Sequence, residues 1–254
     1  MHKYGIREQF RTGFDSLRRA NRLIFSRKGF MKYFFISGLI NVFLIVFFIW
    51  GAYVSSGFFI DKLSLWLNVE ELFFIFKILI KVIIMAGVLL LYLLIYKNLT
   101  IVLMSPFLAL LSEKTEYCVT GKEYPFSLKQ IIKDVLRAVK MSLRNLLWEL
   151  TGTLLLMLFL WVPVINIAVP VFIFLLQGYY LGFSLFDFTL ERHRYNVKES
   201  AAFVRKNRWQ SLFHGIIFFL ILMIPVLGIL AAPVYGVTAA TCGVLAFEKK
   251  IMPG

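Results

Sequence analysis

Cysteines and paired metal ligands are scarce in this sequence of 254 residues. Cys118 and Cys242 lie far apart and lack metal-ligand spacing, and the three histidines are scattered, so we expect packing thiols and no metal site. We also find no Gly-rich phosphate loop and no Ser-centred nucleophile motif. The sequence therefore predicts neither an enzyme nor a bound cofactor.

Charge is missing from long stretches of the chain. Hydrophobic residues make up 60% of the sequence, and no charged residue occurs in residues 33–54 or 150–186. A soluble domain of this length cannot bury so much apolar surface, which predicts an integral membrane protein. The net charge of +14 falls in blocks between the apolar runs. This pattern indicates a cytoplasmic membrane face rather than a nucleic-acid site.

Two apolar runs are long enough for complete transmembrane helices, residues 33–54 and 73–103, since a span needs about 20 residues. The stretch between them is acidic, which predicts that it lies outside and that both termini are cytoplasmic. Lys77 and Lys81 lie one turn apart in the second run. They either extend to the outer interface or line an anion path.

Two later apolar runs, residues 145–186 and 209–247, have basic residues at both ends and proline-containing breaks near Pro163 and Pro225. Residues 150–186 alone would form a helix roughly 55 Å long, too long for one pass across a core about 30 Å thick. Basic flanks on both sides place both ends in the cytoplasm, so each run must turn back. The apolar turns predict re-entrant hairpins, which need burial in a pore or an oligomer.

Residues 6–25 form an amphipathic pattern ahead of the first span. Apolar residues follow helical spacing on one face, and arginines occupy another: Ile6, Phe10, Phe14, Leu17 and Ile24; Arg7, Arg11, Arg18 and Arg22. This predicts a helix in the membrane interface with its arginines against anionic headgroups, or alternatively a cytosolic helix packed on the protein. The expected fold is a single all-α membrane domain over residues 1–254.

A cluster of cations, Arg27, Lys28 and Lys32, surrounds Gly29 and Phe30 where the first span begins. Glycine permits a sharp turn and close approach of a ligand. A helix that starts there presents unpaired N–H groups and the positive end of its dipole. These features predict an oxyanion site. The alternative is a topological anchor that binds no ligand.

A second set of polar residues flanks the first predicted hairpin. One interpretation is a gate or proton-sensitive network at the cytoplasmic mouth of a pore, in which His193 titrates near neutrality. The other is a structural ion-pair cluster that fixes the hairpin to a helix at residues 197–207. The candidate residues are Glu113, Glu116, Asp187, Glu191, His193 and Arg194.

Three features together resemble the CysZ family of bacterial sulfate permeases and the related etoposide-induced membrane proteins. They are SPFLALLSE at residues 105–113 followed by Glu116, FDFTLERHR at 186–194, and the proline-broken run near the C-terminus. The resemblance extends from about residue 10 to 247. It implies two full spans, two partly penetrating hairpins, oligomers, and sulfate uptake for cysteine synthesis.

The resemblance also implies an anion site where the first helix meets the second. The family motif there has glycine with arginine two residues later. In this chain Met31 replaces that arginine, and Lys32 follows.

The leading hypothesis is therefore a permease or channel for a small inorganic oxyanion, sulfate first, in a bacterial inner membrane. Transport would be passive or ion-coupled, the partners being the anion, anionic lipid and further copies of the chain, with no nucleic acid. The alternative is a membrane-shaping scaffold that transports nothing. The scarcity of polar residues for a continuous path favours the scaffold.

Overall fold

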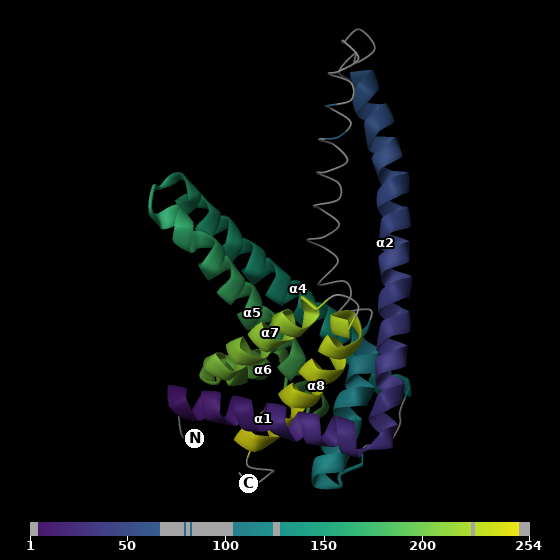
Figure 1. Ribbon diagram of the computed structural model, residues 1–254, viewed down its shortest axis with the longest axis vertical. Coiled ribbons are helices and arrows are strands. Elements are labelled where there is room, and N and C mark those ends of the chain that lie inside the picture. The colour runs from purple at the N-terminus through teal and green to yellow at the C-terminus, as the bar shows by residue number, and fades with distance from the viewer. Residues whose placement is uncertain are drawn as a thin grey trace. The chain divides into compact units, whose positions relative to one another are not determined.

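The computed structural model describes residues 5–66, 79, 82, 104–123, 128–224 and 227–248. All regular structure in these ranges is helical (Figure 1), which confirms the all-α class. The chain divides into two compact units, residues 1–38 with 102–254, and residues 39–101. The boundary falls within helix α2.

The helices follow one another closely along the chain. Residues 104–120 are helical and are called segment 104–120 below. The remaining elements are α1 (Ile6–Ser26), η1 (Lys28–Phe30), α2 (Met31–Trp66), α4 (Leu128–Leu158), η3 (Phe159–Trp161), α5 (Ile165–Arg192), α6 (Val197–Lys206), α7 (Arg208–Leu222) and α8 (Leu227–Phe247).

Four stretches of the described helices are long and apolar enough to cross a membrane: Met31–Gly51, Leu136–Trp161, Ile165–Arg192 and Leu230–Phe247. The first corresponds to the predicted span at 33–54, although α2 continues to Trp66. The predicted span at 73–103, including Lys77 and Lys81, lies outside the described residues except for positions 79 and 82.

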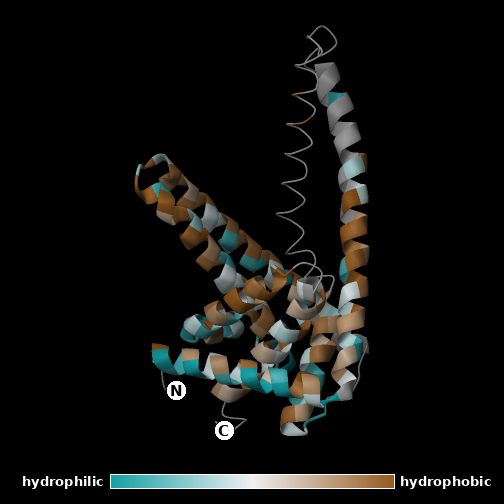
Figure 2. Ribbon diagram, in the orientation of Figure 1, coloured by the Kyte–Doolittle hydropathy of each residue, from teal (hydrophilic) through white to brown (hydrophobic). Residues whose placement is uncertain are grey.

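Helices α4 and α5 form a hairpin in the larger unit (Figure 1). The chain turns at residues 162–164, between η3 and α5, where Pro163 cannot donate a backbone hydrogen bond. Val164 has a φ of 73°, unusual for a β-branched residue. The turn is apolar (Figure 2), and Trp161 is 90% exposed. Its depth in a bilayer stays a prediction.

Helices α7 and α8 pack against each other, and α8 lies at the centre of the larger unit. Helix α7 has 15 residues and spans about 22 Å, less than a hydrocarbon core of about 30 Å. Pro225, in the predicted break, lies outside the described residues. Helix α8 contacts α1, α5 and α7, and most of its side chains are buried.

The contact between α5 and α7 depends on three glycines. A Cβ added to Gly182 would collide with the carbonyl oxygen of Ser211, and one added to Gly215 would collide with the carbonyl oxygen of Gly178. The Ser211 hydroxyl donates to the carbonyl of Tyr179 at 3.0 Å. Small residues thus let the two backbones approach closely, as in membrane helix pairs.

Helix α6 begins directly after the polar end of α5. Asn196 Oδ1 accepts hydrogen bonds from the backbone N–H groups of Lys198 and Glu199, both at 2.9 Å. Glu199 Oε2 accepts in return from the N–H of Asn196 at 2.7 Å. This capping box fixes the start of α6 and the direction in which the chain leaves α5.

We expect Gly182→Ala to lower the free energy of unfolding by about 1–3 kcal/mol, because a new methyl group forces α5 and α7 apart. Thermal unfolding of the detergent-solubilised protein measures the change. Gly5→Ala is the control, since a Cβ at Gly5 has no neighbour within 4 Å. Equal unfolding temperatures for both variants would show that the close approach does not limit stability.

Candidate functional site

The predicted oxyanion site lies at the turn between α1 and α2. Arg27 is extended, with its N–H bonded to the carbonyl of Leu23, and η1 then leads into α2. Gly29 has no positive φ, so a sharp turn is not the reason for glycine at this position. A Cβ there would instead lie 2.9 Å from Lys114 Nζ and 3.0 Å from Lys114 Cε. Glycine makes room for the lysine ammonium.

The predicted residues of this turn differ in their surroundings. Arg27 and Lys32 are exposed, and Lys32 Nζ lies 5.4 Å from the ring centre of Tyr33. The Phe30 side chain is fully buried against Tyr33, and its N–H donates to the carbonyl of Arg27 at 3.0 Å. Phe30 therefore packs the turn. The side chain of Lys28 lies outside the described structure.

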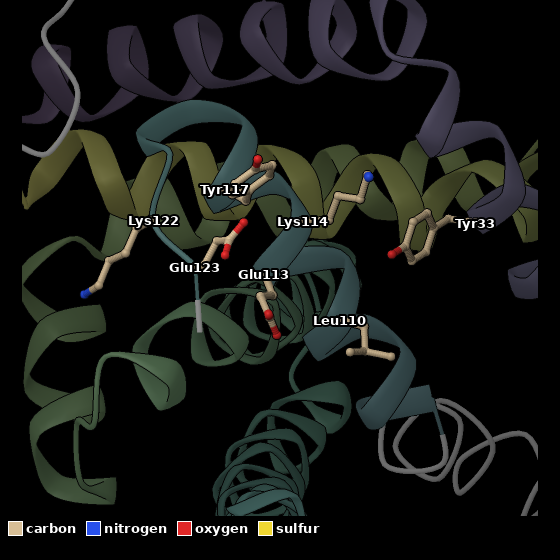
Figure 3. A pocket seen from close by; sticks show the side chains of 7 residues that line it. All are labelled: Tyr33, Leu110, Glu113, Lys114, Tyr117, Lys122 and Glu123. Atoms are coloured by element: carbon tan, nitrogen blue, oxygen red, sulfur yellow. The ribbon is translucent and has the colours of Figure 1, made fainter. Parts of the chain in front are cut away.

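A pocket of about 290 Å³ adjoins the turn (Figure 3). Lys114 lies between Tyr33 and Tyr117 along this pocket, and Lys122 lies at the end away from Tyr33. Its lining residues are Tyr33, Leu110, Glu113, Lys114, Tyr117, Lys122 and Glu123. The pocket thus has two cations and two carboxylates, with one of the cations directly beside Gly29.

Lys114 is the residue that sequence reasoning missed. It lies within the acidic motif of residues 112–116, but nothing in the local pattern connects it to Gly29, which is far away in the sequence. Segment 104–120 brings the two together. Glu113, predicted as part of a gate, lines the same pocket as Lys114 and lies apart from the rest of its predicted group.

A second polar site surrounds Glu116, whose side chain is 0% exposed. Arg192 Nε donates to Glu116 Oε2 at 3.0 Å, and Arg192 Nη2 donates to the hydroxyl of Ser112 at 2.8 Å. His193 Nε2 lies 2.9 Å from Glu116 Oε1, and its Nδ1 lies 2.8 Å from Glu248 Oε2. These five residues are called the Glu116 cluster.

A third site surrounds Arg137 of α4. Its guanidinium binds Asp187 through two hydrogen bonds of 2.9 Å and lies 3.7 Å from a carboxylate oxygen of Glu191. It also donates to the Ser200 hydroxyl at 2.7 Å and to the carbonyl of Tyr195 at 3.0 Å. This arrangement ties α4 to the end of α5 and the start of α6.

The predicted gate residues are therefore divided between different sites. Glu116 and His193 belong to the Glu116 cluster, whereas Asp187 and Glu191 bind Arg137. Arg194 is exposed, has a φ of 65°, and donates its N–H to the carbonyl of Glu191 at 2.9 Å. Its conformation helps end α5.

The pKa of His193 reflects its neighbours. Burial opposes protonation of the imidazole, but hydrogen bonds and charge attraction from Glu116 and Glu248 outweigh it, and the pKa lies above the ordinary 6.5. Folding therefore favours the imidazolium form. Such a group stabilises the fold below its unfolded pKa, and this contribution disappears as the pH rises through the raised folded pKa.

Replacing Glu116 by Ala leaves the buried guanidinium of Arg192 without its carboxylate partner. We expect the free energy of unfolding to fall by about 3–5 kcal/mol. The control is Glu113→Ala, which removes a carboxylate from the half-buried pocket wall and leaves the Glu116 cluster intact. Thermal unfolding of both variants makes the comparison, and a smaller loss for Glu116→Ala than for Glu113→Ala would contradict the expectation.

The pH dependence of stability tests the position of His193. We expect the unfolding temperature of the wild type to fall as the pH rises from 6.5 through the raised pKa of His193. In His193→Gln this decrease is reduced, because the amide does not titrate. An identical pH profile in the two proteins would show that His193 is not linked to stability.

Known proteins provide the remaining information on this chain. The family model "Sulfate transporter CysZ/Etoposide-induced protein 2.4" matches residues 16–233. A sulfate transporter CysZ of Pseudomonas fluorescens Pf0-1 is 31% identical over 134 residues, 52% of this chain and 54% of the relative. Another, from Salmonella typhimurium LT2, is 31% identical over 144 residues, 56% of this chain and 55% of the relative.

These alignments cover about half the length of the curated relatives. The family model, by contrast, covers most of the sequence and includes both the turn at Gly29 and the Glu116 cluster. Together with the four apolar helices, it identifies a multi-pass membrane protein. The chain belongs to the family of the sulfate transporter CysZ and etoposide-induced protein 2.4.

Proposed function

We propose that this chain is a permease for a small inorganic oxyanion, with sulfate as the first candidate. The observation that carries the proposal is the ammonium of Lys114 beside Gly29, close to the start of α2. Relatives that are named sulfate transporters support the choice of anion. The site is the turn of Arg27, Lys28, Gly29 and Lys32 together with Lys114.

Lysine charge, rather than backbone N–H groups, carries the proposed binding. The N–H of Phe30 is already bonded within the turn, whereas the ammonium of Lys114 faces Gly29 and Lys32 is exposed. An ammonium acts as a point charge and lacks the planar fork with which arginine binds an oxyanion. We therefore expect weak discrimination among oxyanions of similar size and charge.

Lys114 also explains how a site can persist without the arginine of the family motif. Met31 occupies that position and is exposed. Lys114 supplies a cation to the same turn from segment 104–120. The nearby carboxylates of Glu113 and Glu123 line the adjoining pocket and disfavour a second anion. Binding of this strength suits transport, which requires both entry and release.

The proposal includes the surroundings of the protein. The positive-inside rule places the basic blocks and both termini in the cytoplasm of a bacterium with the chain in its inner membrane. Large apolar side chains on α4 and α5 are exposed, which fits an oligomer embedded in lipid, with the hairpins lining the path. Sulfate imported in this way, passively or with a coupled ion, would feed cysteine synthesis.

Uptake of radiolabelled sulfate into liposomes containing the purified protein tests the proposal. We expect uptake above that of empty liposomes, and on the order of tenfold less with Lys114→Met, because a hydrogen bond to a charged group is worth about 1.5–3 kcal/mol. Methionine keeps much of the apolar stem. The control is Lys198→Met, which removes an exposed lysine of α6.

The outcomes separate the site from the function. Uptake that is equal in wild type and Lys114→Met would retain the permease and place the anion elsewhere. If the folded and inserted wild type gives no uptake, the permease is wrong, and a membrane scaffold becomes the better account.

A further inference from the structure

The N-terminal helix α1 packs on the protein through a face that is small and polar rather than apolar. Its buried residues are Gln9, Gly13, Ser16, Ala20 and Ile24. Gln9 accepts a hydrogen bond from the N–H of Trp209 at 3.1 Å, and the Ser16 hydroxyl lies 2.8 Å from His214 Nε2. Specific hydrogen bonds thus hold α1 on α7 and α8, and its apolar stripe is not needed for this contact.

Much of the apolar stripe of α1 consequently stays exposed. Ile6 is 54% exposed and Phe14 is 55% exposed. Phe14 lies against Phe213 at 4.8 Å between ring centres, and Phe10 lies 6.5 Å from Trp209. The aromatic rings therefore form a ledge along the line where α1 meets α7.

Arginines follow the apolar stripe one residue later along α1, about 100° further around the helix. Arg7, Arg11 and Arg22 are all exposed. The nearest acidic side chain, Asp15, makes only a 4.0 Å contact with the exposed Arg18. The start of α7 continues the pattern, because the guanidinium of the exposed Arg208 lies 5.4 Å from the ring centre of Trp209.

We propose that this surface binds anionic phospholipid headgroups. It consists of Ile6, Phe14 and Trp209 on the apolar side and Arg7, Arg11 and Arg22 on the basic side, and is called the α1 lipid surface. The apolar residues enter the boundary of the acyl chains while the arginines bind phosphates. Exposed apolar side chains beside a row of arginines match the charge and polarity of an anionic bilayer surface. The proposal is independent of which solute is transported.

Quenching of Trp209 by brominated lipids tests this inference. The protein retains Trp209 alone, with Trp50, Trp66, Trp148 and Trp161 replaced by Phe, and is reconstituted in phosphatidylcholine vesicles. An equal mole fraction of brominated phosphatidylglycerol or brominated phosphatidylcholine is then included. We expect stronger quenching by the phosphatidylglycerol. Arg7→Gln/Arg11→Gln/Arg22→Gln should make the two lipids quench equally.

Lys133→Gln/Lys140→Gln/Lys198→Gln is the matched control, because it removes three exposed cations from α4 and α6 and should keep the preference. Equal quenching by both lipids in the unsubstituted background would overturn the role of anionic headgroups. A preference that survives in the arginine variant would overturn the role of these arginines. Absence of quenching by either lipid would mean that something other than lipid, such as an acidic protein, covers the surface.

If the single-tryptophan protein does not fold, the same comparison is made by measuring the phosphatidylglycerol retained through purification. Both triple variants are then prepared in the otherwise natural sequence. The inference predicts less retained phosphatidylglycerol in the arginine variant than in the wild type and the lysine variant. Equal retention in all three proteins would contradict it.

Discussion

The burial of Glu116 is the constraint on which the candidate sites depend. A carboxylate without contact with water is tolerated only when it is paired and hydrogen-bonded. Here Arg192 and His193 supply the partners, and His193 also reaches Glu248 after the end of α8. One side chain thus joins segment 104–120 to the ends of two other helices. Lys114 lies two residues before Glu116, so this ion pairing also helps fix its ammonium beside Gly29.

Close helix packing positions the partners of Glu116. Glycines at the contact of α5 with α7 bring two backbones together, and the capping box at Asn196 sets the path of the chain after α5. Arg137 then binds Asp187 near the same helix end. Buried hydroxyls of Ser112, Thr189 and Thr241 lie within 2.8–3.1 Å of one another and join the same three elements. Polar contacts and small residues here replace the apolar core of a soluble protein.

The sequence was sufficient to predict elements that depend on local composition. Charge-free runs predicted apolar helices, and Pro163 lies in the turn at residues 162–164. The apolar stripe of α1 was also recognised, but its packing face was not, because small and polar residues such as Gly13 and Ser16 have no distinctive pattern. Their role depends on α7 and α8, which come much later in the chain.

Contacts between distant residues could not be predicted in the same way. The sequence grouped Glu113 with Glu116 because they are neighbours, whereas three residues of helix place them on different faces. It placed Gly29 in a turn that requires glycine for its backbone, whereas the structure shows a close neighbour, Lys114. Arg137 was recognised only as part of a basic helix face, and its pairing with Asp187 requires the α4–α5 hairpin.

The proposed transport rests on an oxyanion that binds at one particular turn. The position of bound selenate, a heavier analogue of sulfate, is the measurement that tests this most directly. Crystals of the protein grown with selenate would give an anomalous signal from selenium. The account predicts a peak beside Gly29 and Lys114 Nζ. Ordered selenate elsewhere in the protein, with none at this turn, would contradict it.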